Sequence, residues 1–244
     1  MNQYVNFSKE RLIVKRIKSQ TVTITKLLKT IPHYLSGSYL MNAVFSPMQE
    51  HGDIDVYFPK KKNYNAALKV LLNVKKAKLL YQTQYASTFI IDNKVFQLVK
   101  NAVKNIFNLA NQHDFSNCCL AFNCLTDFLH ITPQAKTAWS KNALLLNKSP
   151  LTNTAYPAPL FLNQLNLLYL RIIKYTQRYR LALSKDFKLV LKSLCSLAKK
   201  HLTLYQKKEY LYDYAGTRIV CLLSKESLLK KLEAVQHEDY LFKL

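Results

Sequence analysis

Glycine is the residue that this 244-residue chain most clearly lacks, with three in the whole sequence. Nucleotide-binding loops of the P-loop and Rossmann types need several glycines at fixed spacing, because their backbone approaches phosphate oxygens closely. Neither G-x-x-x-x-G-K-[ST] nor G-x-G-x-x-G occurs in the sequence. Both kinds of site are therefore excluded.

Paired metal-binding residues are also missing. The five cysteines are an odd number, and no two have the C-x-x-C spacing of a structural zinc site. The six histidines contain no H-E-x-x-H pair, so we do not expect a zinc enzyme. We expect reduced, buried thiols, and the strand-like sequence around Cys118 and Cys119 favours packing over nucleophilic chemistry.

Long apolar runs are absent too. No stretch approaches the ~18 uninterrupted apolar residues that a membrane span requires. Lys9, Glu10 and Arg11 lie where a secretory leader would have its apolar segment. We therefore expect a cytosolic protein that does not insert into a membrane.

Acidic residues are scarce. The chain has 36 Lys and Arg against 14 Asp and Glu, which gives a formal charge of +22. This excess predicts a polyanionic partner, with nucleic acid favoured over an anionic membrane surface. A lysine-rich codon bias is the alternative explanation. Two aspartates one residue apart, Asp53 and Asp55, stand out in the acid-poor first 157 residues and suggest a metal site.

The hydrophobic pattern predicts an α+β fold with a mixed sheet, followed by an all-helical part. The proline-containing segment 147–159 is the best candidate linker, so we predict domains at 1–150 and 151–244. The expected strands of the first domain are 33–35, 53–58, 87–91, 95–99, 117–123 and 128–132, with a hairpin turn at 92–94. Its expected helices are 8–31, one from about 39, 60–76, 102–111 and one that starts at Pro133. The second domain is expected to contain helices 160–183, 184–204, 206–214 and 225–235.

The segment from Gly37 to Val56 contains the residue types of a phosphoryl-transfer site. A Gly-Ser turn that opens a helix, at Gly37 and Ser38, offers backbone N–H groups and a hydroxyl to a triphosphate. In a strand, residues i and i+2 share a face, so Asp53 and Asp55 can hold one or two divalent cations together. A lone D-x-D is more often a solvated strand end, but its combination with the upstream turn is more specific.

These residues resemble the G-S…D-x-D motif of the polymerase-β-like nucleotidyltransferase superfamily, with fourteen residues between Ser38 and Asp53. The wider sequence is similar to nucleotidyltransferase-like proteins of large DNA viruses and phages. The resemblance implies a nucleotidyltransferase fold, Mg²⁺ or Mn²⁺ as cofactor, and a location in the host-cell cytoplasm or a virion. It also implies a third carboxylate on a later strand, where this chain has Gln97. Asp114 is the best substitute, which makes Asp53, Asp55 and Asp114 the expected catalytic residues.

A second group of candidates lies at 171–178. Arg171, Lys174, Tyr175 and Arg178 fall at i, i+3, i+4 and i+7 and share one helical face. We expect the cations to bind triphosphate oxygens and the Tyr175 ring to stack on a base. A similar Arg…Lys-Tyr…Arg helix occurs in the virus and phage proteins named above. The alternative is a solvated basic face without a ligand.

The sequence therefore supports three hypotheses. The first is a metal-dependent transferase that moves a nucleoside monophosphate from an NTP to RNA or DNA, with Asp53 and Asp55 as metal ligands and Gly37 and Ser38 at the triphosphate. The second is a catalytically degenerate protein of the same fold that binds nucleic acid through backbone contacts or joins protein partners in a viral or phage assembly. The third, the small nucleotidyltransferase partner of a toxin pair, fits poorly with the charge of +22.

Overall fold

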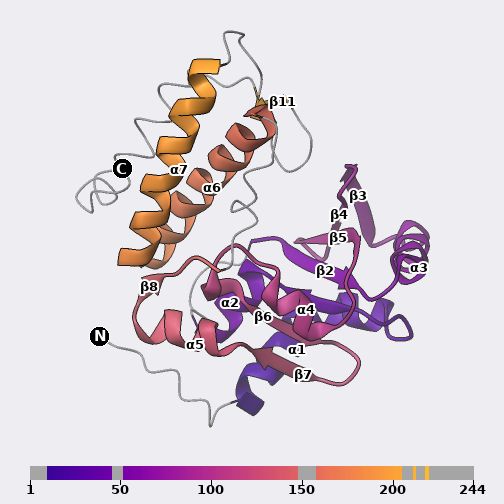
Figure 1. Ribbon diagram of the computed structural model, residues 1–244. Helices are drawn as coiled ribbons and strands as arrows, with labels where there is room; N and C mark the ends of the chain where they lie inside the picture. Colours follow the sequence, from indigo (N-terminus) through magenta and orange to yellow (C-terminus); the bar gives the residue numbers. More distant parts are fainter. Residues whose placement is uncertain (1–9, 46–51, 148–157, 205–210, 213–217, 220–244) are drawn as a thin grey trace. The chain divides into compact units, whose positions relative to one another are not determined.

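The computed structural model describes residues 10–45, 52–147, 158–204, 211–212 and 218–219 (Figure 1). Two compact units divide the chain, Met1–Ser140 and Lys141–Leu244. Most of the predicted linker, including the predicted boundary at residue 150, lies outside the described residues. The division into domains 1–150 and 151–244 therefore stays a prediction.

The first unit is built on one seven-stranded sheet with the order β3-β4-β5-β2-β1-β6-β7 (Figure 1). β2 and β5 pair in parallel, and all other neighbours in the sheet are antiparallel. The strands are β1 (Tyr34–Ser36), β2 (Ile54–Phe58), β3 (Ala77–Gln82), β4 (Ala86–Ile91), β5 (Lys94–Ala102), β6 (Leu120–Asn123) and β7 (Phe128–Ile131). The predicted mixed sheet of an α+β fold is confirmed.

Helices pack on both faces of this sheet. They are α1 (Glu10–Leu27), α2 (Ser38–Phe45), α3 (Lys61–Leu72), α4 (Ile106–Asn111) and α5 (Pro133–Ser140). Every residue of α2 is buried. The ring of Tyr64 in α3 meets the ring of Phe58 edge to face, with centroids 5.9 Å apart, and its hydroxyl is 2.6 Å from the Ser87 hydroxyl. These contacts place α3 on the Phe58 side of the sheet.

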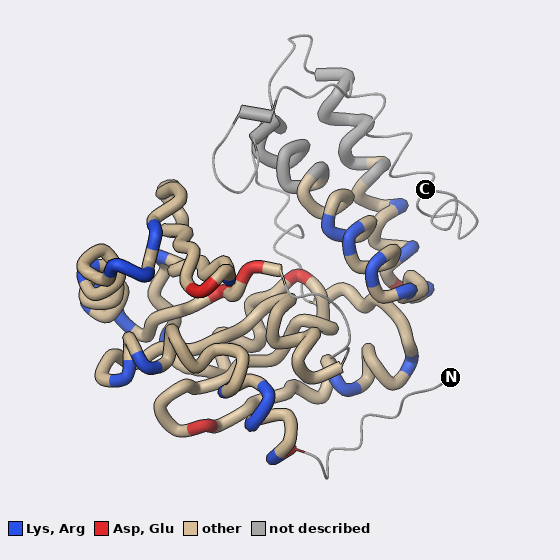
Figure 2. Tube along the Cα trace, turned by 180° about the vertical axis from the view of Figure 1, so that it is seen from behind, with Lys and Arg blue, Asp and Glu red and all other residues tan. Residues whose placement is uncertain are grey.

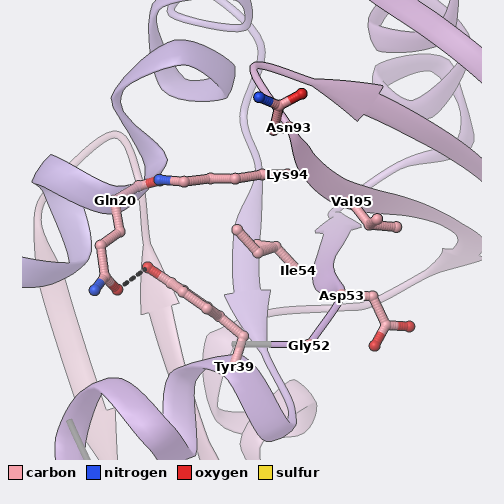
Figure 3. A pocket seen from close by; sticks show the side chains of 8 residues that line it. All are labelled: Gln20, Tyr39, Gly52, Asp53, Ile54, Asn93, Lys94 and Val95. Atoms are coloured by element: carbon pink, nitrogen blue, oxygen red, sulfur yellow. Dashed lines mark hydrogen bonds between the residues drawn. The ribbon is translucent and has the colours of Figure 1, made fainter. Parts of the chain in front are cut away.

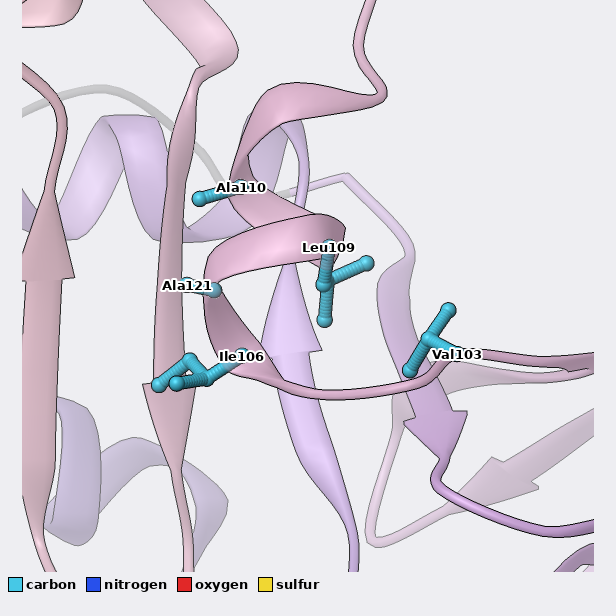
Figure 4. Close-up of a cluster of buried hydrophobic side chains, with 5 residues drawn as sticks. All are labelled: Val103, Ile106, Leu109, Ala110 and Ala121. Carbon is cyan, nitrogen blue, oxygen red and sulfur yellow. The ribbon is translucent and has the colours of Figure 1, made fainter.

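The two faces of β2 have different surroundings. Ile54, Val56 and Phe58 are buried, whereas Asp55 and Tyr57 are half-buried on the opposite face. On that opposite face, α4 packs on Ala121 of β6 in a cluster of five buried side chains, and Tyr57 and Tyr34 border it (Figure 4): Val103, Ile106, Leu109, Ala110 and Ala121. Asp55 is half-buried, so this part of the face remains partly accessible.

Several boundaries differ from the predicted ones for local reasons. The hairpin of β4 and β5 is confirmed, and it turns through Asp92 and Asn93 with positive φ at both, the geometry of a type I′ turn. β5 runs on to Ala102, so α4 starts only at Ile106, where the Asn105 side chain accepts a hydrogen bond from the Asn108 N–H at 2.8 Å. β3 was not predicted, because as an edge strand it has mostly exposed side chains and no apolar alternation.

The second unit contains two long helices, α6 (Ala158–Tyr179) and α7 (Lys185–Leu204). α7 begins after Ser184, whose hydroxyl accepts a hydrogen bond from the Phe187 N–H at 3.1 Å. Two short strand pairs accompany the helices: β8 (Ala143–Leu144) with β9 (Ala182–Leu183), and β10 (Leu211–Tyr212) with β11 (Arg218–Ile219). The helix predicted over 206–214 was wrong at Leu211–Tyr212, which form a strand, and the helix predicted over 225–235 lies outside the described residues.

Two expectations from composition can be compared with the structure. Cys118, Cys119 and Cys124 are free, buried thiols, as predicted. Burial, assisted by the neighbouring Cys118 and Asp114, raises the pKa of Cys119 to about 12, which disfavours a nucleophilic thiolate. Within the part of the chain that is described, no helix is both long enough and apolar enough to cross a membrane.

Candidate functional site

The Gly37 turn lies directly against the Asp55 carboxylate. Gly37 connects β1 to α2 with φ +85°, a conformation that disfavours side chains with a Cβ. A Cβ at this position would be 2.8 Å from Asp55 Oδ2. The register explains the contact, because Ser36 and Asp55 are directly opposite each other on the antiparallel strands β1 and β2. The fold thus brings together the two halves of the predicted motif.

Asp53 and Asp55 are the acidic residues of this motif. Asp53 immediately precedes β2 and is exposed, whereas Asp55 is half-buried within the strand. Two other aspartates of the unit stabilise turns instead: Asp92 accepts a hydrogen bond from the Thr23 hydroxyl at 2.7 Å, and Asp127 forms a 2.5 Å ion pair with Lys18. Both have positive φ and lie in turns.

The N-terminus of α2 follows the turn. Ser38 is the first residue of the helix, and the Met41 N–H donates to the Gly37 carbonyl at 3.1 Å. The first N–H groups of a helix have no partner within the helix, and the helix dipole makes this end electropositive. An anion that approached Gly37 and Ser38 would therefore meet N–H groups on one side and the Asp55 carboxylate on the other. A divalent cation between carboxylate and phosphate would reconcile the two negative groups.

Gln97 occupies the position beside Asp55 on the neighbouring strand. The two residues are directly paired in the parallel register of β2 and β5, so both side chains are on the same face of the sheet. Among the residues that the structure describes, no three His, Cys, Asp or Glu side chains are grouped closely enough to hold a metal ion. Asp114 therefore does not complete a three-carboxylate group with Asp53 and Asp55.

The donor set nevertheless fits a hard divalent cation. Mg²⁺ in nucleotide-dependent enzymes is commonly held by one or two carboxylates together with substrate phosphates. Asp53 and Asp55 supply carboxylate oxygens. Among the described residues, no group of three or more potential metal ligands contains a thiolate or an imidazole. Asp53 and Asp55 are thus the residues that would hold Mg²⁺ or Mn²⁺.

His113 reaches the site from the segment after α4, and Asp114 is the next residue in the chain. His113 Nε2 is 2.5 Å from the Ser36 hydroxyl, which donates its own proton to the Leu120 carbonyl at 2.5 Å. Because a hydroxyl has one proton, Nε2 must carry the hydrogen of the first bond. This bond ties the segment to the strand that leads into the Gly37 turn. Burial raises the pKa of the adjacent Asp114 to about 6.

The second predicted group lies on α6 in the other unit. Lys174 is exposed, whereas Arg171 and Arg178 are half-buried. Tyr175 is buried and its ring stacks on that of Tyr179, with centroids 5.9 Å apart, while Lys174 Nζ is 5.8 Å from the Tyr175 ring. The predicted contacts of these four residues with a nucleotide stay predictions. The observed role of Tyr175 is packing along its own helix.

Comparison with solved structures identifies the fold of the chain as that of nucleotidyltransferases. It is similar to a CCA-adding enzyme in complex with ATP, at 12% identity and a TM-score of 0.58 over 96% of this chain and 55% of that one. It is also similar to the Thermotoga maritima CCA-adding enzyme complexed with tRNA, at 14% identity and a TM-score of 0.53 over 82% and 50%. The chain spans about half the length of these enzymes.

A family profile gives a closer assignment. Residues 7–142 match the family described as Gabija anti-defense 2 family protein. The match covers more than half of the chain, which therefore belongs to this family. No curated protein sequence matches the chain.

Some residues of the site were not found by sequence reasoning. Ser36 and His113 were given no role from sequence and are 77 residues apart, and the hydrogen bond between them, with Ser36 directly opposite Asp55, links both to the site. The one available signal was position, since Ser36 directly precedes the Gly37 turn and His113 directly precedes Asp114. His51, two residues before Asp53 in the sequence, lies outside the described residues.

Replacing Gly37 by alanine should displace Asp55. We expect a loss of about 1–2 kcal/mol in unfolding free energy from the left-handed backbone. The carboxylate must also move away from the new Cβ, so metal affinity should fall more than stability does. Urea unfolding and Mn²⁺ binding measure the two effects. In an Asp55→Ala background the same substitution should cost less stability, and an equal cost in both backgrounds would contradict the contact.

The raised pKa of Asp114 predicts a pH-dependent stability. A carboxyl whose folded-state pKa is above its unfolded value stabilises the protein below pH 4, and this contribution is lost as pH rises through about 6. Asp114→Asn should therefore be more stable than the wild type at pH 8, by up to about 3 kcal/mol. The difference should vanish near pH 4. Urea unfolding across this range tests the prediction, and parallel stability curves for the two proteins would contradict it.

Proposed function

We propose that this protein transfers a nucleoside monophosphate from an NTP to a polynucleotide. The observation that carries the proposal is the contact between the Gly37 turn and the Asp55 carboxylate within a nucleotidyltransferase fold. It supports one site for a triphosphate at Gly37 and Ser38 and for a divalent cation at Asp53 and Asp55. Residues 1–150 would form the catalytic domain, and residues 151–244 a basic helical domain.

The reaction is a displacement at the α-phosphorus of the NTP. An acceptor hydroxyl attacks in line, a new O–P bond forms, the bond to the β-phosphate oxygen breaks, and pyrophosphate leaves. The N–H groups at the start of α2 would bind and orient the phosphates, and Asp53 and Asp55 would hold Mg²⁺ or Mn²⁺. The cation would neutralise charge on the phosphates. Asp114 is proposed as the third catalytic residue, with a carboxylate that would accept the hydroxyl proton.

The acceptor is proposed to be nucleic acid because of charge and exposed aromatic rings. Lys and Arg greatly outnumber Asp and Glu along the described chain (Figure 2). Phe107 of α4 contacts Phe128 and His130 of edge strand β7, with ring centroids 6.3 and 4.8 Å away, and both phenylalanines are about half exposed. Exposed rings on a positively charged protein suit the stacking of unpaired bases.

The position of this aromatic cluster, which consists of Phe107, Phe128 and His130, supports the same proposal. His130 pairs with Ala121, Ala121 with Ser36, and Ser36 with Asp55 in one continuous register. His130 therefore shares a sheet face with Asp55, three strands or about 14 Å away. An acceptor strand bound at the cluster would have its end within a few nucleotides of the proposed catalytic residues.

The second unit is proposed to add phosphate contacts. Arg171, Lys174 and Arg178 present three cations along α6, and guanidinium groups bind phosphate oxygens in pairs. We propose that they contact the triphosphate or the acceptor backbone. Because the Tyr175 ring packs on Tyr179, the three cations are stronger candidates for nucleotide binding than Tyr175 is.

The family gives a biological setting for the proposal. Its description names an activity against Gabija defense, so we propose that nucleotidyl transfer serves this purpose in the cytoplasm of an infected cell. A viral or phage origin of the chain and contacts with partner proteins in an assembly belong to the same proposal.

One observation favours a second function, binding without transfer. Gln97 stands directly beside Asp55, where the motif resemblance implies a third carboxylate. An amide is a poor ligand for a catalytic Mg²⁺. A degenerate site would still bind a nucleotide through the Gly37 turn and nucleic acid through its charge.

A labelled-nucleotide assay distinguishes these functions. The protein is incubated with each labelled NTP, Mg²⁺ or Mn²⁺, and single-stranded RNA or DNA. We expect label transfer that Asp53→Ala/Asp55→Ala reduces at least about a hundredfold, because the phosphate charge loses its stabilisation. Asp127→Asn, a matched change at a turn aspartate, should leave transfer unchanged. Equal binding of the strand by all three proteins with no transfer by any would overturn the catalytic proposal.

The aromatic cluster provides an independent prediction for the acceptor. Phe107→Ala/Phe128→Ala should weaken single-stranded RNA or DNA binding by about 1–3 kcal/mol per base that loses its stacking partner. The salt dependence of binding should stay the same, because no cation is removed. Fluorescence anisotropy at several salt concentrations measures both. Leu189→Ala, at an exposed apolar residue of α7, is the control, and unchanged affinity in the aromatic variant would exclude the cluster from binding.

A further inference from the structure

A pocket of about 360 Å³ lies behind Asp53, on the side away from its carboxylate (Figure 3). Its wall combines Gln20 of α1, Tyr39 of α2, Ile54 of β2, Asn93 of the turn between β4 and β5, and Lys94 at the start of β5. The volume is near the lower end of the range for small-molecule sites, about 300–1,000 Å³. The pocket therefore has room for a ligand of nucleoside size, and none of the roles proposed above uses it.

A short chain of hydrogen bonds fixes the polar wall of the pocket. Lys94 Nζ donates to the Gln20 carbonyl at 2.6 Å, and the Tyr39 hydroxyl donates to Gln20 Oε1 at 3.2 Å (Figure 3). The Gln20 side chain is thereby oriented, and no described residue accepts a hydrogen bond from its NH₂ group. The Asn93 amide likewise has no hydrogen-bond partner within the described part of the chain. Two carboxamides are thus available to a ligand.

The chemistry of the wall selects the kind of ligand. The Asp53 carboxylate points away from the pocket, and the Lys94 ammonium donates a hydrogen bond to the Gln20 carbonyl, so amides and a phenol make up the rest of the polar wall. Ile54 and Val95 add apolar surface. Carboxamides present a donor and an acceptor side by side, which matches the edge of a nucleobase. With the Asp53 carboxylate turned away, a metal ion would find no charged ligand here.

We propose that this pocket binds a nucleobase. The inference rests on the proposed function in taking nucleotides as substrates, but it concerns a separate part of the molecule. Gly52 and Asp53 form part of the wall, so a nucleotide with its base in the pocket has its sugar and phosphate next to the D-x-D segment. The base belongs either to the donor NTP or to the terminal nucleotide of the acceptor.

Nucleosides are the probe, because without phosphate they cannot use the triphosphate site. Binding of adenosine, cytidine, guanosine and uridine is measured by NMR titration without divalent metal. We expect saturable binding of at least one nucleoside, and at least a tenfold loss of affinity in Gln20→Glu/Asn93→Gly. Glutamate keeps the acceptor for Tyr39 and removes the NH₂ donor, and glycine keeps the positive φ of Asn93 (60°). Asn142→Gly, at another asparagine with positive φ (48°), is the matched control and should bind as the wild type does.

The same variants separate the two sources of the base. A raised KM for the NTP alone assigns the pocket to the donor, and a raised KM for the polynucleotide alone assigns it to the acceptor. Absence of saturable binding for all four nucleosides, or equal binding by the wild type and the double variant, would overturn the proposal. Nucleoside binding that persists in Asp55→Asn, and is lost in the double variant, supports the pocket even if no nucleotidyl transfer is found.

Discussion

The site depends on the absence of one side chain. Gly37 allows the chain to turn from β1 into α2 while the Asp55 carboxylate lies where a Cβ would be. Everything else in the candidate site is placed relative to this contact. The register of β1 and β2 places Asp55 next to Gly37, and α2 begins at the residue after Gly37. The hydrogen bond from His113 to Ser36 fixes the strand that leads into the Gly37 turn. In a chain with only three glycines, one stands at the position where steric contact demands it.

The two faces of β2 have different roles in the first unit. Ile54, Val56 and Phe58 point into the core and stabilise the sheet, while Asp55 points to the face that α4 covers only in part. Stability and function are thereby assigned to alternate residues of the same five-residue strand. The sequence D-I-D-V-Y-F shows both roles, because its apolar positions alternate with the polar ones.

Much of this arrangement was predictable because it is local. The turn at Asp92 and Asn93, the strand from Ile54 and the Gly-Ser turn each have a short sequence signal, and the structure contains all three. The motif resemblance put Gln97 at the position of a third carboxylate, and the register of β2 and β5 sets it beside Asp55. A helical pattern also identified α6 and α7 to within a few residues.

What sequence reasoning missed depends on long-range pairing. The pocket joins Gln20, Tyr39 and Asn93, which no spacing rule connects, and His113 reaches Ser36 only because β6 pairs with β1. β3 was missed for a different reason, since a solvated edge strand lacks the alternation that identifies half-buried strands. Short sequence patterns therefore identified the individual helices and strands. Which of these elements meet at the pocket and at the candidate site could be known only from the order of strands in the sheet.

The position of β1 between β2 and β6 also affects when its pairing can be completed during synthesis. Ser36 faces Asp55 on one side and Ala121 on the other, so the three residues of β1 are not fully paired until β6 has been synthesised. At about 5–20 residues per second, a ribosome needs roughly 4–17 s to pass from Ser36 to Ala121. Throughout that interval the nascent chain carries its Gly-Ser turn without the strand that supports it. The pairing of β1 with β6 and the hydrogen bond from His113 to Ser36 are therefore added to the site only after its Gly37 turn and Asp55 have been made.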